Sequence, residues 1–133
     1  MLFRSWPAYH NTLLFTCDAT KPYKITNDEN DQVKFDCITA WEVIEHIGPD
    51  ELDQFFSNII EHMHSESIFV GSISVVPSYW NYGGEVRQLH QSVFDKSYWM
   101  QTILPKYFKV EEYPFTYKVR YEDTSFWVKL MKK

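Results

Sequence analysis

The chain has 133 residues, a length that fits one domain with a buried core. Its formal net charge of −5 argues against broad, sequence-independent binding of nucleic acid, which depends on an excess of Lys and Arg. No apolar stretch approaches the roughly 20 residues that cross a bilayer, and the first ten residues lack the apolar centre of a secretory signal. We therefore expect a cytoplasmic protein that does not enter a membrane.

The N-terminal part contains two apolar runs separated by a polar loop. Leu13–Cys17 predicts a short strand that ends at Asp18, and residues 34–41 (KFDCITAW) predict a second strand. The second run is almost continuously apolar, which predicts burial on both faces, as in a parallel sheet covered by helices. Each run contains one of the two cysteines, so we expect buried free thiols.

A helix with a single apolar stripe comes next. Gly48 is its predicted N-cap, Pro49 fits the first helical position, and residues 52–63 carry apolar side chains at spacings of three and four. His62 and His64 lie in the last turn, where a positive charge would complement the helix dipole. Residues 67–76, rich in β-branched side chains, predict a third strand.

The C-terminal part begins with residues 77–94, which contain a Gly-Gly pair and several aromatic residues and predict a long binding loop. A helix is predicted from an N-cap at Asp95 to Pro105, which ends it. Residues 107–119 and 125–133 predict a terminal antiparallel strand pair. The order strand, strand, helix, strand, helix, strand, strand predicts an α/β fold.

Four segments, in this order, resemble the class I S-adenosylmethionine-dependent methyltransferases: LLFTCDATKP, FDCITAWEVIEHI, LDQFFSNIIEHMHSESIFVGSIS and LHQSVFDKSYW. They look like the family's third strand, its fourth strand with the following turn, the next helix with the fifth strand, and a segment before the last helix. The closing strand pair is similar to the reversed seventh strand of that fold. The resemblance covers the chain from about Thr12 onward. It implies a Rossmann-like sheet of strand order 3-2-1-4-5-7-6 with helices on its faces.

One part of the family pattern is missing. The glycine-rich cofactor loop and the acidic residue after the second strand have no counterpart, because Gly48 is the first glycine of the chain. We therefore predict a single, partial methyltransferase domain over residues 1–133 that lacks the first two strands, which leaves costly unpaired backbone groups. Three explanations stay open: a truncated product, a homodimer or partner chain that completes the sheet, or strand three moved beside strand four.

The resemblance implies methyl transfer from S-adenosylmethionine to an O or N nucleophile of a small molecule or glycan. It places Asp18 at the adenine amino group, with Ala19 beside it. Ligands of parallel α/β folds sit at the carboxyl ends of strands, so we expect Trp41 and Glu42 to line the cofactor and acceptor pocket. In the alternative interpretation Asp18 caps a turn and Trp41 is a core residue.

The turn after the second strand carries further candidates. We expect His46 to orient or deprotonate the acceptor and assign His90, from the long loop, a catalytic role beside it. Alternatively, Glu45 and His46 only cap a short helical turn. Together with Glu42, these residues offer carboxylate and imidazole ligands for a divalent cation such as Mg²⁺. The ExxEH pattern with a later histidine resembles the Hen-type RNA 2′-O-methyltransferases, in which Mg²⁺ binds the terminal ribose hydroxyls.

A non-catalytic function is the competing class. A degenerate domain would scaffold a partner methyltransferase through the surface left open by the missing strands, and would expose apolar area along strands three and four. The loop aromatics Tyr79, Trp80 and Tyr82 either stack on a planar or sugar-like acceptor or pack on the core.

Overall fold

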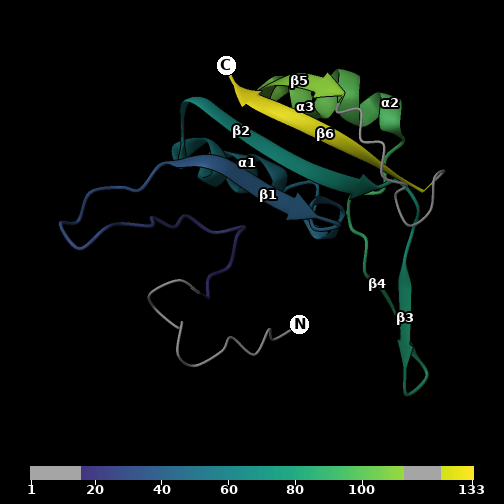
Figure 1. Cartoon of the computed structure of the whole chain (residues 1–133). Helices are drawn as coiled ribbons and strands as arrows, with labels where there is room; N and C mark the ends of the chain where they lie inside the picture. The colour runs from purple at the N-terminus through teal and green to yellow at the C-terminus, as the bar shows by residue number, and fades with distance from the viewer. Residues whose placement is uncertain (1–15, 113–123) are drawn as a thin grey trace.

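The computed structural model of the chain describes residues 16–112 and 124–133 (Figure 1). In chain order its elements are β1 (Phe35–Trp41), the 3-10 turn η2 (Ile44–His46), α1 (Leu52–Glu61), β2 (Met63–Ser74), β3 (Tyr79–Tyr82), β4 (Glu85–Gln88), α2 (Lys96–Tyr98), the π-helical turn η3 (Trp99–Ile103), α3 (Leu104–Tyr107), β5 (Phe108–Glu112) and β6 (Ser125–Lys132). This order confirms the predicted α/β class. Among the described residues, no helix has the length and apolar character needed to span a membrane.

Four strands form one sheet in the order β1-β2-β6-β5. β1 and β2 are parallel, whereas β6 is antiparallel to both β2 and β5. This is the 4-5-7-6 part of the strand order that the resemblance implies, with β6 as the reversed seventh strand. Gly71 allows the close approach of β1 and β2, because a Cβ at this position would lie 2.5 Å from the carbonyl oxygen of Ala40. No strand of the described part of the chain pairs with the other edge of β1.

One hydrophobic core lies between this sheet and the helices. Figure 1 shows α1 behind β1 and β2. The rings of Phe56 on α1 and Phe108 at the start of β5 meet edge to face, with centroids 5.4 Å apart. Alternate residues of β6 point into the core, where Phe126, Val128 and Leu130 are buried. The described helices therefore cover the same face of the sheet.

The prediction that residues 34–41 are buried on both faces is wrong. Cys37 and Trp41 of β1 are exposed, because the described helices cover one face of the sheet and the outer edge of β1 is open. Cys17 is exposed as well. Both thiols are free, as predicted, but neither is buried. Of the first predicted strand, Leu13–Phe15 lie outside the described residues, and Thr16 and Cys17 form no regular element.

The first long helix begins later than predicted. The segment Gly48–Glu51 closes as a turn, in which the amide of Glu51 donates to the carbonyl of Gly48 at 2.9 Å. α1 therefore begins at Leu52. Met63, the last residue of the predicted stripe, is buried but already belongs to β2.

Asp95 caps the next helix as predicted, since its carboxylate accepts a hydrogen bond from the amide of Tyr98 at 2.7 Å. Pro105 does not end the helix and instead lies in the first turn of α3. The wide π-helical turn η3 precedes Pro105. It accommodates the proline, which has no N–H and whose ring would crowd the turn before it in a regular α-helix. Of the last two predicted strands, β5 and β6 are confirmed, and residues 113–119 lie outside the described residues.

Residues 77–94 are not a long loop, because β3 and β4 form an antiparallel hairpin. Its two-residue turn consists of Gly83 and Gly84, whose φ angles are 61° and 88°. Two successive positive φ angles are typical of a type I′ turn, which matches the twist of the flanking strands. Figure 1 shows the hairpin extending away from the main sheet.

Candidate functional site

The segment after β1 reverses direction at Glu42. This residue has a φ of 52°, in the left-handed region that side chains rarely adopt. Its amide donates to Ser72, 3.3 Å from the carbonyl oxygen and 3.0 Å from Oγ, and its Oε2 accepts from the hydroxyl of Ser125 at 3.3 Å. These contacts stabilise the reversal and begin the turn η2, which carries Glu45 and His46.

Residues 89–92, which follow the hairpin, bind to this turn. The amides of Gln91 and Ser92 donate to the carbonyl of Glu45 at 2.7 and 3.0 Å. The buried hydroxyl of Ser92 donates to the carbonyl of Ile47 at 2.6 Å. Two segments far apart in the sequence are thereby fixed side by side, and His90 lies next to His46 as the metal interpretation required.

The two histidines share one arrangement. Nδ1 of His46 lies 3.0 Å from the carbonyl oxygen of Leu89, and Nδ1 of His90 lies 2.6 Å from that of Val76. Because a carbonyl only accepts hydrogen bonds, each Nδ1 carries a proton, and Nε2 of each neutral ring keeps its lone pair for a proton or a metal ion. The rings meet edge to face, with centroids 4.8 Å apart.

Glu45 is a buried carboxyl group without a partner. Its side chain is 0% exposed, and neither oxygen has a hydrogen-bond partner among the described residues. Burial raises the pKa of Glu45 to about 7, and the carboxylate of Glu42 adds to the rise. The backbone amides of Glu45 and Ser74 counteract it in part, although neither reaches hydrogen-bond geometry. A buried carboxylate without a partner is unfavourable. It is stabilised when it takes up a proton or when a cation binds beside it.

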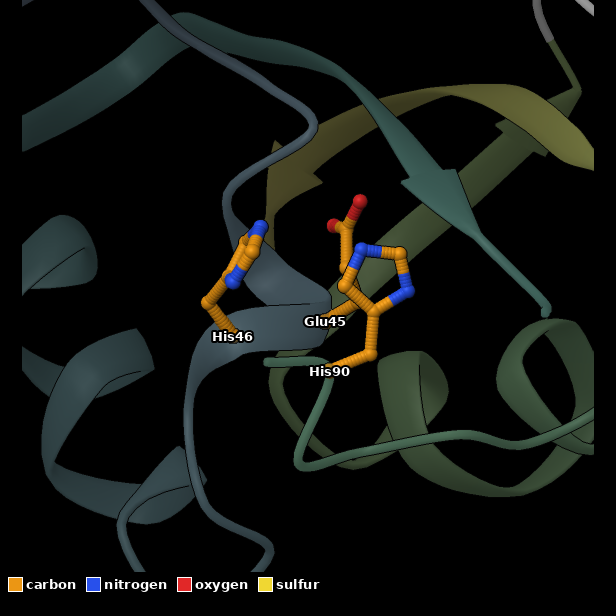
Figure 2. Close-up of side chains that lie close together, drawn as sticks. All are labelled: Glu45, His46 and His90. Atoms are coloured by element: carbon orange, nitrogen blue, oxygen red, sulfur yellow. The ribbon is translucent and has the colours of Figure 1, made fainter. Parts of the chain in front are cut away.

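Figure 2 shows Glu45, His46 and His90 around a common space. One ligand atom of each lies within 4.8 Å of the other two. Ligands of a tetrahedral zinc ion lie about 3.4 Å apart, so side-chain rotation would have to close the group further. Two imidazole nitrogens and one carboxylate oxygen suit Zn²⁺ or a related transition ion better than Mg²⁺, which prefers oxygen ligands. Glu42, the fourth predicted ligand, is not part of this group.

Asp18 and Ala19, the predicted adenine contacts, lie in a turn that is tied to α1. Oδ1 of Asp18 accepts from Thr20, from the amide at 2.9 Å and the hydroxyl at 2.7 Å, and these hydrogen bonds lower the pKa of Asp18. The carbonyl of Ala19 accepts from Nδ2 of Asn58 at 2.9 Å. Asp18 thus caps a turn, as the alternative interpretation expected, and a role in cofactor binding stays a prediction.

Trp41, the predicted pocket residue at the end of β1, is 44% exposed and packs against Trp127, with ring centroids 4.7 Å apart. It borders a cavity of about 400 Å³ beside the open edge of β1. The lining residues are Tyr23, Ile38, Thr39, Ala40, Trp41, Val43, Phe55, Ile59 and Phe69. Neither Asp18 nor Glu42 lines this cavity, so they do not face it together.

His62 is a structural residue whose role the sequence did not reveal. Its buried ring donates from Nδ1 to the carbonyl of Asn58 at 2.7 Å and accepts at Nε2 from the amide of Ile25 at 3.0 Å. The ring of Tyr23 stacks on it at 5.2 Å. His62 follows α1 as its C-cap and His64 belongs to β2, so the prediction that they lie in the last turn of the helix is wrong. No local signal identifies the role of His62, because Ile25 lies 37 residues away.

No protein-family model and no curated protein matches the chain. Among solved structures, it is similar to the PH0226 protein from Pyrococcus horikoshii OT3, with 14% identity and a TM-score of 0.57 over 88% of this chain and 57% of that one. It is also similar to the glycopeptide N-methyltransferase MtfA complexed with S-adenosyl-L-homocysteine, with 10% identity and a TM-score of 0.56 over 88% and 59%. An S-adenosylmethionine-dependent methyltransferase from Clostridium acetobutylicum ATCC 824 gives 11% identity and a TM-score of 0.56 over 87% and 63%.

The chain thus spans about three fifths of the length of these proteins. At 10–14% identity these similarities support a shared fold and no more than that. The described sheet, with its reversed strand β6, agrees with it. The chain has the Rossmann-like fold of the class I S-adenosylmethionine-dependent methyltransferases, in part.

Proposed function

We propose that the chain is part of a methyltransferase that uses S-adenosylmethionine and methylates an O or N nucleophile of a small molecule or glycan. The observation that carries the proposal is the β1-β2-β6-β5 sheet with the Glu42 turn at the carboxyl end of β1, the position where ligands of such sheets bind. The part of the fold beyond the open edge of β1 would complete the site.

The residues at this end of β1 fit part of the cofactor. Trp41 offers an exposed aromatic ring, and the adjoining cavity of about 400 Å³ falls in the size range of small-molecule sites. Glu42 and, from a separate turn, Asp18 with Ala19 beside it would offer carboxylates for the polar groups, although neither carboxylate lines this cavity. When bound, S-adenosylmethionine supplies a methyl group on a sulfonium sulfur, which leaves as a neutral thioether. Alignment of the nucleophile is then the main task of the protein.

His46 is the residue that we propose for the proton of the nucleophile, with His90 beside it. The Nδ1–H of each ring is held by a backbone carbonyl, so Nε2 can accept the proton that an O or N nucleophile loses as it is methylated. A non-catalytic scaffold is the competing function, and it would bind no cofactor.

Titration calorimetry with S-adenosylhomocysteine tests cofactor binding by the chain. Binding that is lost in Asp18→Ala but kept in Asp28→Ala, an exposed loop aspartate, would support the proposed adenine contact. The absence of heat from a folded chain would contradict cofactor binding by these residues alone and favour the scaffold.

As an alternative to proton transfer by His46, we propose a divalent transition metal at Glu45, His46 and His90, because the unpaired buried carboxyl of Glu45 lies beside two imidazoles. Such an ion would compensate the charge of Glu45 and bind an acceptor hydroxyl. It is independent of the cofactor. The proposed ion is Zn²⁺ or a related transition ion, and Mg²⁺ has no support in this donor set.

Cobalt(II) is a suitable probe, because its visible spectrum reports the ligand set. We expect bands typical of nitrogen and oxygen ligands, which Glu45→Gln and His90→Gln weaken. The control His64→Gln, at a half-buried histidine of β2 paired with Asp36, should leave them unchanged. Binding should strengthen as the pH rises through about 7, because Glu45 must lose its proton. Equal spectra for all four proteins would contradict the site.

We finally propose that another strand pairs with the open edge of β1, supplied by a second copy or a partner. The exposed Cys37 of β1 and the apolar cavity that residues 38–41 of the same strand border support this. The mass of the chain in solution and the alkylation rate of Cys37 test it. A monomer whose Cys37 reacts equally fast at all protein concentrations would contradict self-assembly.

A further inference from the structure

The hairpin of β3 and β4 presents aromatic side chains to solvent instead of packing them on the core. Tyr79, Trp80 and Tyr82 are 61%, 54% and 74% exposed, and Val86 is 63% exposed. The prediction left open whether these residues pack on the core or bind an acceptor, and their exposure excludes the first interpretation. A group of large exposed apolar side chains on a projecting element is typical of an interaction site (Figure 1).

The strand register divides the hairpin into two different faces. Trp80 pairs with Arg87 and Tyr82 pairs with Glu85, so these four side chains share one face. The rings of Trp80 and Tyr82 lie 5.5 Å apart at 30° to each other, and Nη2 of Arg87 donates to Oε2 of Glu85 at 3.0 Å. The same four residues line a hollow of about 130 Å³.

This combination fits a neutral sugar. Two nearly parallel aromatic rings offer an apolar platform for the C–H face of a pyranose, and the carboxylate of Glu85 and the guanidinium of Arg87 accept from and donate to its hydroxyl groups. The pair carries no net charge, and the whole chain is acidic, so the face lacks the cationic excess that a phosphate backbone requires. The opposite face has one aromatic ring, Tyr79, and no such ion pair.

We propose that this face of the hairpin binds a neutral carbohydrate. The base of the hairpin is fixed to the candidate site, because His46 and His90 donate to the carbonyls of Leu89 and Val76 on either side of it. A saccharide held on the hairpin is therefore tethered beside the proposed methyl-transfer site. Its role as the methyl acceptor rests on the proposed function, whereas its binding does not.

Binding is tested without any cofactor, so that failure of methyl transfer and failure of sugar recognition are separate results. The probes are maltohexaose, cellohexaose and chitohexaose, titrated against the 133-residue chain and followed by tryptophan fluorescence and by NMR. We expect at least one to bind, and Tyr82→Ala and Arg87→Ala to weaken it about tenfold. Tyr79→Ala, on the opposite face, should bind as the unchanged chain does.

Three results would overturn the inference. The first is that none of the three saccharides binds. The second is that Tyr79→Ala weakens binding as much as Tyr82→Ala does. Sedimentation of the same variants decides the alternative occupant: a dimer that Tyr82→Ala converts to a monomer would assign the face to a second copy of the chain and also overturn the inference.

Discussion

The buried carboxyl of Glu45 predicts an unusual dependence of stability on pH. In the unfolded chain this group ionises near pH 4.5, whereas in the folded chain burial keeps its proton to about pH 7. Between these values the folded state binds more protons than the unfolded state, so the free energy of unfolding falls as the pH rises. The stabilisation is complete below about pH 4.5 and is lost once the pH passes 7.

The magnitude follows from the pKa difference. At about 1.36 kcal/mol per unit of pKa, a rise from 4.5 to about 7 corresponds to about 3 kcal/mol. Glu45→Gln keeps the shape and polarity of the protonated group but cannot ionise. We therefore expect the variant to match the unchanged chain at pH 4.5 and to be more stable by about 3 kcal/mol at pH 8.

Urea unfolding at pH 4.5, 6 and 8, in the presence of a chelator, measures this difference. Glu66→Gln, at an exposed position of β2, is the control and should follow the unchanged chain at every pH. Parallel pH profiles for Glu45→Gln and the unchanged chain would refute the reasoning, since they would mean that Glu45 ionises alike in both states. Added Zn²⁺ should recover the stability lost by the unchanged chain at pH 8, but not alter the variant.

Three further predictions concern the frame around the site. Gly71→Ala should lower the free energy of unfolding by about 1–3 kcal/mol, measured in urea, because the new Cβ would force β1 and β2 apart. His62→Phe should speed hydrogen exchange at the amide of Ile25, which loses its buried acceptor, and an unchanged rate would contradict the assigned bond. In dilute solution Cys17 and Cys37 should both react with a thiol reagent in the native chain, and protection of Cys37 alone at higher protein concentration would support the proposed strand beside β1.

Much of the fold was predictable because its signals are local. The apolar stripe of α1, the cap at Asp95 and the strand pair at the C-terminus are confirmed, although Pro105 lies inside a helix that it was expected to end. The exposure of Cys37 could not be read from the sequence. The apolar run around it is typical of a covered strand, but none of the described elements buries Cys37.

The hairpin was missed for a different reason. The length and aromatic content of residues 77–94, with the Gly83-Gly84 pair, are also typical of a binding loop. The two-residue spacing between alternating runs was the available signal.

The site was predicted in part. The spacing of Glu45 and His46 indicated one face of a turn, and the structure confirms that His90 lies with them. Glu42 does not belong to the group of Glu45, His46 and His90, because its positive φ directs its side chain toward Ser125. No pattern of residue types indicates such a reversal at a glutamate. The sequence also could not predict that the Glu45 carboxyl lacks a hydrogen-bond partner, because this depends on the positions of its neighbours in the folded chain.

The strand register of the hairpin limits how its length can change in related sequences. Side chains alternate between faces, so adding or removing two residues in each strand leaves Trp80 and Tyr82 on their present side. A change by one residue would turn them to the opposite side while their backbone pairing stayed intact. The body of the protein contacts the hairpin at its base, so the strands of homologous hairpins should differ in length by even numbers of residues. An odd difference would indicate that the hairpin presents its other face to a ligand.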